Sequence, residues 1–251
     1  SVGGTVTLNG SIVTSNDAVV LGAVTLGSAT TVDTNSSDTT GDITIGAVTG
    51  GSNSLTLSTG DNVADTDISA SGAISGVTTL TLCDVGGTAT LSADVDVTTL
   101  TVGNTVANVA FTGNGSSVTN AVSFANDGTL ILGANGGTQT YNGGLTTTSV
   151  SGTVTLNGSI VTSNDAVVLG AITLGSATTV DTNASSDAAD ITVAAITGGS
   201  NNLTLSTGNN ITGADVTASG AISGLGNLTL ADVGGTATFS NNVAAAALSA
   251  D

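Results

Sequence analysis

The chain has 251 residues, and its 18 acidic residues face no Lys, Arg or His, so the formal charge at pH 7 is −18. Without Lys or Arg it has no means of neutralising a phosphate backbone or an anionic lipid surface, which excludes nucleic-acid and polybasic membrane binding. Without His it lacks the imidazole of Ser-His-Asp and Cys-His catalysis and the commonest zinc ligand, so we expect no enzyme and no cofactor.

Short stretches that alternate apolar and hydroxyl residues predict strands along the whole chain. They are bounded by Gly, Asn, Asp and Ser, and Ala244 to Ala247 is too short a run to nucleate a helix. An apolar fraction of 39% against 7% charged residues argues against disorder. No apolar run reaches the length of about 18 residues that crosses a bilayer, so we expect no membrane insertion. In chain order the clearest predicted strands are Thr5 to Leu8, Leu55 to Leu57, Leu80 to Leu82, Thr88 to Leu91 and Leu130 to Leu132.

The sequence repeats itself without a gap every 148 residues, starting again at Ser149. About 71 of the 103 aligned pairs are identical, up to Asp251 opposite Gly103. A long period kept in register is typical of modules that stack on their neighbours. We therefore expect residues 1–148 and 149–251 to be two units of one continuous structure, the second truncated, and the chain to be a window of about 1.7 units cut from a longer array.

Shorter echoes lie inside each unit and predict its coils. A Gly-Ala-Val/Ile-Thr/Ser pattern begins at Gly22, Gly46 and Gly72, and V-x-G-T-x-T-[LF] begins at Val2, Val85, Val150 and Val233. The first echo suggests coils near 25 residues and the second near 21, hence six or seven coils per unit. We predict an all-β fold, a parallel β-solenoid, because stacked coils suit Val, Leu and Ile ladders, leave little room for large rings and exclude Pro, which is absent. A string of β-sandwich modules is the alternative, but these need about 100 residues each and bulky core anchors.

The stretches Ala70 to Val95 and Gly198 to Gly224 resemble the repeats of giant bacterial surface proteins, the filamentous-haemagglutinin-like and β-strand-repeat adhesins. The resemblance covers essentially the whole chain. It implies a secreted β-solenoid located outside the cell or on its surface. The absence of basic residues and the unusually regular repeat depart from those adhesins and favour a regular fibre shaft over receptor binding.

Asp residues are the candidate metal ligands. Asp61, Asp65 and Asp67 form the densest cluster and have the oxygen ligands that Ca²⁺ prefers, but the second unit keeps only Asp215. Asp94 and Asp96 likewise become Asn242 and Ala244. We therefore expect no specific metal site, and only diffuse binding of Ca²⁺ or other divalent cations by surface Asp.

Five Asp pairs persist between the units, and they suggest either cation bridging between fibres or turn formation. We favour turn formation, because Asp bonds its own backbone and tolerates tight corners. The pairs are Asp17/Asp165, Asp33/Asp181, Asp42/Asp190, Asp67/Asp215 and Asp84/Asp232.

Three further features have an ordinary explanation. Cys83 is Ala231 in the second unit, which favours a small buried residue over a reactive thiol. The Thr-x-Thr pairs, such as Thr5/Thr7, fit β-propensity better than ice binding. Several glycosylation sequons are expected by chance in a chain so rich in Ser and Thr. They begin at Asn9, Asn35, Asn114, Asn157, Asn183, Asn202, Asn210 and Asn227.

These observations together predict an extracellular structural protein that forms the shaft of a filament, sheath or surface fibre. Its expected partners are copies of itself stacked end to end. The stalk of a large secreted adhesin is the alternative, and a surface-layer lattice protein is the third. No residue is predicted to be catalytic, to bind a cofactor or to hold a specific metal.

Overall fold

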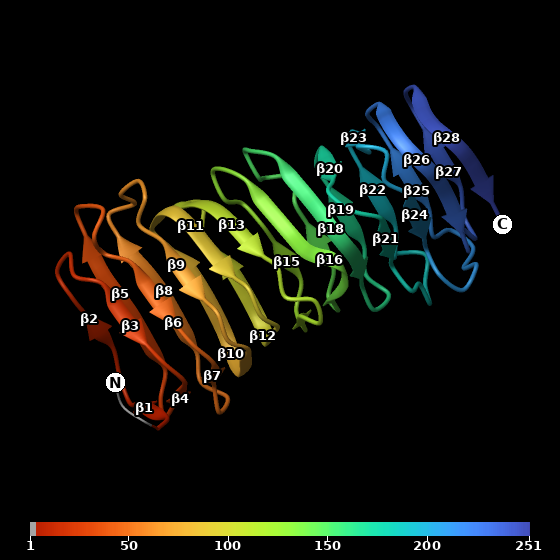
Figure 1. Cartoon of the computed structure of the whole chain (residues 1–251). Coiled ribbons are helices and arrows are strands. Elements are labelled where there is room, and N and C mark those ends of the chain that lie inside the picture. Colours follow the sequence, from red (N-terminus) through yellow and green to blue (C-terminus); the bar gives the residue numbers. More distant parts are fainter. Residues whose placement is uncertain (1–3) are drawn as a thin grey trace.

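The computed structural model describes residues 4–251, apart from the side chain of Asn135, and over that range it is all-β without a helix. The chain winds into a parallel β-solenoid of about 11 turns that follow one another about 22 residues apart, which confirms the predicted fold. Figure 1 shows an elongated stack with the two termini at opposite ends. Val2, which begins one of the sequence echoes, lies outside the described residues.

Each turn places strands on three faces, which we call faces I, II and III in the order in which the chain visits them. Face I holds β1 (Val6–Leu8), β4 (Val24–Leu26), β7 (Val48–Thr49), the first parts of β10 (Ile74–Cys83) and β12 (Val95–Val102), β14 (Ser117–Val118), the last parts of β16 (Leu130–Tyr141) and β18 (Val154–Val161), β21 (Thr178–Asp181), β24 (Leu203–Ser206), and the last parts of β26 (Ile222–Ala231) and β28 (Val243–Ala250).

The other two faces follow in the same way, and the long strands bend from one face to the next. Face II holds β2 (Ile12–Val13), β5 (Thr30–Ser36), β8 (Leu55–Gly60), the last parts of β10 and β12, β15 (Val122–Ser123), β17 (Leu145–Thr146), β19 (Val167–Leu169), β22 (Ile191–Val193), β25 (Val216–Ala218) and β27 (Ala237–Phe239). Face III holds β3 (Val19–Leu21), β6 (Ile43–Ile45), β9 (Ile68–Ala70), β11 (Val85–Leu91), β13 (Val106–Phe111), the first parts of β16 and β18, β20 (Ile172–Leu174), β23 (Ile196–Thr197), and the first parts of β26 and β28.

Side chains that point inward form continuous apolar columns. On face III one column starts at Val19 and is completely buried through most of its length. Each member is paired in parallel register with the residue one turn further along, so the interior is a ladder of Val, Ile and Leu instead of a single globular core. Its members are Val19, Ile43, Ile68, Ala89, Val109, Leu130, Val154, Ile172, Ile196 and Ile222.

The sequence analysis expected little room for large rings inside the solenoid. The interior is wider than that, since it holds three of the four aromatic rings fully buried. The rings of Phe111 and Tyr141 lie 6.5 Å apart, and the Tyr141 hydroxyl donates to Oε1 of the buried Gln139 at 3.0 Å. The Gln139 amide in turn donates to the Phe111 carbonyl at 2.7 Å. These buried polar groups are therefore paired, and burial raises the pKa of the Tyr141 hydroxyl.

The ladder runs through the boundary between the two sequence units without interruption. Leu130 pairs with Val154 and Leu132 with Leu156, where β16 of the first unit meets β18 of the second. Backbone bonds at the boundary, such as Leu130 N to Thr153 O at 2.9 Å, match those elsewhere in the stack. The two units thus continue one solenoid.

The register also gives the number of turns in a unit, which the sequence analysis placed at six or seven. Val154 is the sequence equivalent of Val6, but it lies in the face III column six turns beyond Val19, whereas Val6 lies on face I. Face III follows face I by two-thirds of a turn. The 148-residue unit therefore contains six and two-thirds turns.

The same corner conformations recur in both units. Asn16 and Asn164 have φ of 67° and 68°, and Asp84 and Asp232 have φ of 55° and 52°. Asn and Asp tolerate this left-handed region better than other residues that carry a Cβ. Corner residues thus fix where the chain leaves one face for the next.

We predict that the stack depends on inward apolar contact at the unit boundary. Leu156→Asp places an unpaired carboxylate in the interior and should lower the free energy of unfolding by about 3–5 kcal/mol. Thr155→Asp adds the same charge to the adjacent, half-buried outward position and should cost about 1 kcal/mol or less. Urea unfolding followed by far-UV circular dichroism measures both, since the chain has no Trp. Equal losses would contradict a continuous interior at the boundary.

Candidate functional site: an acidic corner and a shallow groove

Two of the persistent Asp pairs shape turns, as the sequence analysis favoured. Oδ1 of Asp33 accepts the backbone N–H of Asn35 at 2.8 Å, and Asp181 accepts that of Asn183 at the same distance. Asp84 and Asp232 instead occupy left-handed backbone positions. In both cases the residue serves the local chain path.

Two other pairs connect one turn to the next, a role that the sequence analysis missed. Oδ1 of Asp42 accepts the backbone N–H of Asp67 at 2.9 Å, and Oδ1 of Asp67 accepts that of Thr88 at 2.7 Å. Asp190, Asp215 and Thr236 repeat both bonds at 2.8 and 2.6 Å. These carboxylates satisfy backbone donors at corners where the strand ladder is interrupted. Recurrence of Asp one coil length apart was the only signal in the sequence.

The Asp61–Asp65–Asp67 cluster serves as corner structure. Asp65 has φ of 66°, and its equivalent, Gly213, keeps a positive φ of 92° without a carboxylate. The position therefore keeps its backbone shape when the side chain is lost, and the Asp67 carboxylate is engaged by Thr88. Within residues 4–251 no group of three or more His, Cys, Asp or Glu side chains is placed to hold a metal ion.

Glycines of the V-x-G-T motif let β11 pass close over the corner below it. A Cβ at Gly86 would lie 2.0 Å from the carbonyl oxygen of Val63, and one at its equivalent, Gly234, would lie 2.2 Å from the carbonyl carbon of Asn210. Any larger residue there would force the corner away. Gly86 and Gly234 fill the variable position of the motif, and its constant glycine is confined as well: a Cβ at Gly87 or Gly152 would lie 2.8 or 2.5 Å from the carbonyl oxygen of Thr66 or Gly128. The glycine that the echo repeats thus marks a close approach of two backbones.

Buried Thr residues line the inner side of the same corners. Thr34 Oγ1 donates to the Gly41 carbonyl at 2.6 Å, and Thr59 Oγ1 donates to the Asp84 carbonyl at 2.7 Å. Thr207 repeats the second contact with the Asp232 carbonyl at 2.8 Å. These hydroxyls satisfy carbonyls that would otherwise be unpaired inside the corner.

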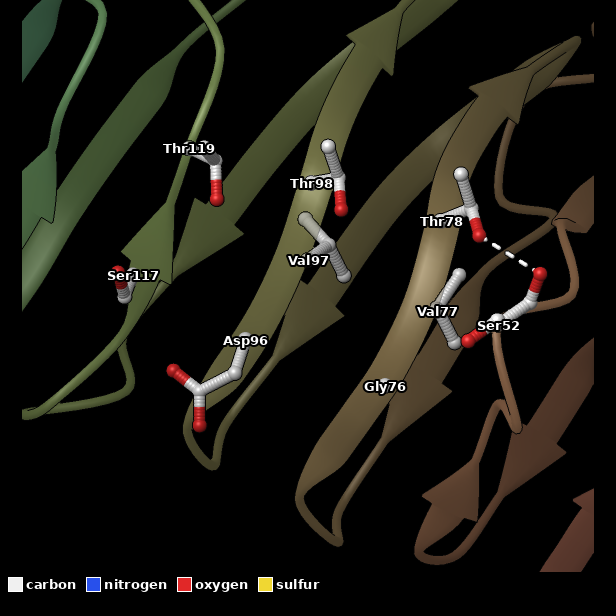
Figure 2. Close-up of a pocket in the computed structure, with 9 residues that line it drawn as sticks. All are labelled: Ser52, Gly76, Val77, Thr78, Asp96, Val97, Thr98, Ser117 and Thr119. Carbon is white, nitrogen blue, oxygen red and sulfur yellow. Dashed lines mark hydrogen bonds between the residues drawn. The ribbon is translucent and has the colours of Figure 1, made fainter.

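A shallow groove of about 300 Å³ lies where β10, β12 and β14 bend between faces I and II (Figure 2). Its one charged group is Asp96, and the Thr78 hydroxyl donates to the Ser52 carbonyl at 2.7 Å. Among the groove residues drawn in Figure 2, the Asp96 carboxylate has no hydrogen bond to a hydroxyl, so no lining hydroxyl is held by a base. The second unit places Gly226, Ala244 and Ala246 at the positions of Thr78, Asp96 and Thr98, so the groove is not a property of the repeat.

Cys83 is half-buried on face II, next to Ser58 of the preceding turn. Burial and the negative charge of Asp84 raise the pKa of its thiol to about 11. Little thiolate therefore exists at neutral pH, which fits the interpretation of Cys83 as a packed residue.

The remaining candidates lie on the surface. Of the sequon residues, Asn157 is half-buried and the other seven are exposed, including Asn202, which precedes β24, and Asn227, which lies within β26. Thr7, Thr25 and Thr49 stack in an outward column of face I, which is the arrangement expected from β-propensity. In the described part of the chain no helix is long and apolar enough to span a bilayer.

Comparison with known proteins adds no relative. No family model, no curated protein and no solved structure matches this chain.

We predict that Cys83 reacts slowly in the native protein. At pH 8 its reaction with a disulfide reagent should be at least about tenfold slower than in urea, where the thiol pKa returns to about 8.5. The native rate should keep rising with pH until about 11. A native rate equal to the rate in urea would contradict the buried, charge-opposed environment.

Proposed function

We propose that this chain is an extracellular structural protein, in which stacked β-solenoid units build the shaft of a filament, sheath or surface fibre. The observation that carries the proposal is the interior ladder that passes from β16 to β18 across the unit boundary. Repetition of the unit therefore lengthens one rod instead of adding separate domains.

End-to-end contact between coils is the proposed mode of growth. Where the two units meet, Leu132 pairs with Leu156 and both side chains are completely buried, so one coil laid on another completes the column between them. A further coil, from the same chain or a second copy, would pair its backbone with the coil before it in the same way. Divalent cations bound by surface Asp would then act between neighbouring shafts.

Electron cryo-microscopy of native material tests this function. We expect continuous rods with an axial layer line near 4.8 Å and a rise of about 32 Å per unit, which is six and two-thirds turns of that spacing. Immunogold labelling of intact cells should place the rods outside. Short isolated particles, or label only in permeabilised cells, would overturn the proposal and favour the stalk of an adhesin or an internal role.

A further inference from the structure

Most of the negative charge lies on a single corner of the solenoid within each unit. In the first unit this is the corner between faces II and III, which we call the II/III corner. In the second unit it is the I/II corner. The Asp residues at or beside these corners are Asp17, Asp33, Asp38, Asp42, Asp61, Asp65, Asp67, Asp84 and Asp127 in the first unit, and Asp165, Asp181, Asp187, Asp190, Asp215 and Asp232 in the second.

The corner changes because a unit is not a whole number of turns. Asp17 follows β2 on face II, whereas its equivalent, Asp165, follows the part of β18 on face I. Val161 confirms this placement, because an unbroken register connects it with Thr140, Ser117 and, through β12, β10, β7 and β4, with Thr7 of β1. Each unit thus turns its acidic corner by one face relative to the unit before it.

A whole number of turns would have a different result. Every unit would place its charge on the II/III corner, and the other two corners would remain nearly neutral along the shaft. Face I lies between those two corners, and its outward column consists of Thr7, Thr25, Thr49 and Ser75 before it reaches Asp96. Flat, uncharged β faces with short side chains pack face to face against copies of themselves unless charge opposes them.

We propose that the fractional turn is a device against lateral association, since it distributes the repulsive charge around the shaft. Two corners are acidic in this chain, and the III/I corner, where β11 leads into β12, carries Asp94 with Asp96 just beyond it. A third unit would place its acidic corner there, so three units would cover all sides. The partner that is excluded is a second copy of this chain approaching side by side. The role in a fibre rests on the function proposed above, but the charge placement in a single chain does not.

Two variants of equal charge test the proposal. The first replaces Asp165, Asp181, Asp187, Asp190, Asp215 and Asp232 by Asn, which removes the acidic I/II corner. The control replaces Asp33, Asp42, Asp67, Asp165, Asp187 and Asp232 by Asn, which leaves charge on both corners and removes the equivalent backbone-accepting carboxylates of the first unit. Asn keeps an acceptor oxygen and tolerates positive φ, so both variants should retain the corner geometry.

At low ionic strength we expect the first variant to self-associate at least tenfold more strongly than the control in sedimentation equilibrium. Added salt should remove the difference by raising the association of the control. Equal association at low salt would overturn the proposal. If circular dichroism shows that a variant with six replacements does not fold, the comparison is repeated with two triple variants. One replaces Asp165, Asp187 and Asp232 by Asn, and the other replaces Asp17, Asp61 and Asp187 by Asn. The measurement uses the purified chain, so a negative result here would leave the microscopy of native fibres, which tests the proposed function, unaffected.

Discussion

Parallel pairing of each turn with the next is the interaction on which this structure depends. Every residue of a strand meets the residue about one turn further along, so an inward position must accept a column of similar side chains. The column from Val19 to Ile222 meets this condition with Val, Ile, Leu and one Ala. Proline would remove a rung from the ladder, and its absence follows from the same constraint.

The corners accommodate the variation in coil length that the paired strands on the faces do not allow. Coil length varies there: paired residues are 18 positions apart between Val6 and Val24 but 26 apart between Val48 and Ile74. The additional residues are accommodated by left-handed Asn, Asp and Gly, by buried Thr hydroxyls, and by Asp carboxylates that accept backbone N–H groups of the next turn. Two unit charges one coil apart repel by only about 1 kcal/mol in water, so these bonds withstand the stacking of Asp42 under Asp67.

Much of the fold was predictable from the sequence, because strand alternation and register both leave local patterns. Thr5 to Leu8, Leu80 to Leu82 and Thr88 to Leu91 lie in or overlap strands, and the repeat predicted stacking. The two echoes disagreed because they sample different turns. Gly22, Gly46 and Gly72 cross the long corners of the second and third turns, whereas the three turns from Ile68 to Leu130 are about 21 residues long. The number of turns in a unit depends on the face that each strand occupies, and no local pattern contains that information.

Less of the candidate site was predictable. Turn formation explains Asp33 and Asp84, but the bond from Asp67 N–H to Asp42 depends on which corner lies above which, and only the register gives that. The gathering of charge on one corner has the same origin. Fold and electrostatics are thus coupled through the six and two-thirds turns of the unit.

Pulsed dipolar spectroscopy of paired spin labels tests this turn count most directly. In a Cys83→Ala background, labels at Ser15 and Ser149 lie on the same corner six turns apart, and we predict a distance of about 29 Å. Labels at Ser15 and Ser163, which are exposed and sequence-equivalent, should be clearly further apart, because they also lie on different sides of the shaft. The opposite result would be a Ser15–Ser163 distance close to the axial rise alone, together with a longer Ser15–Ser149 distance. That result would show that the unit is a whole number of turns and would contradict this account.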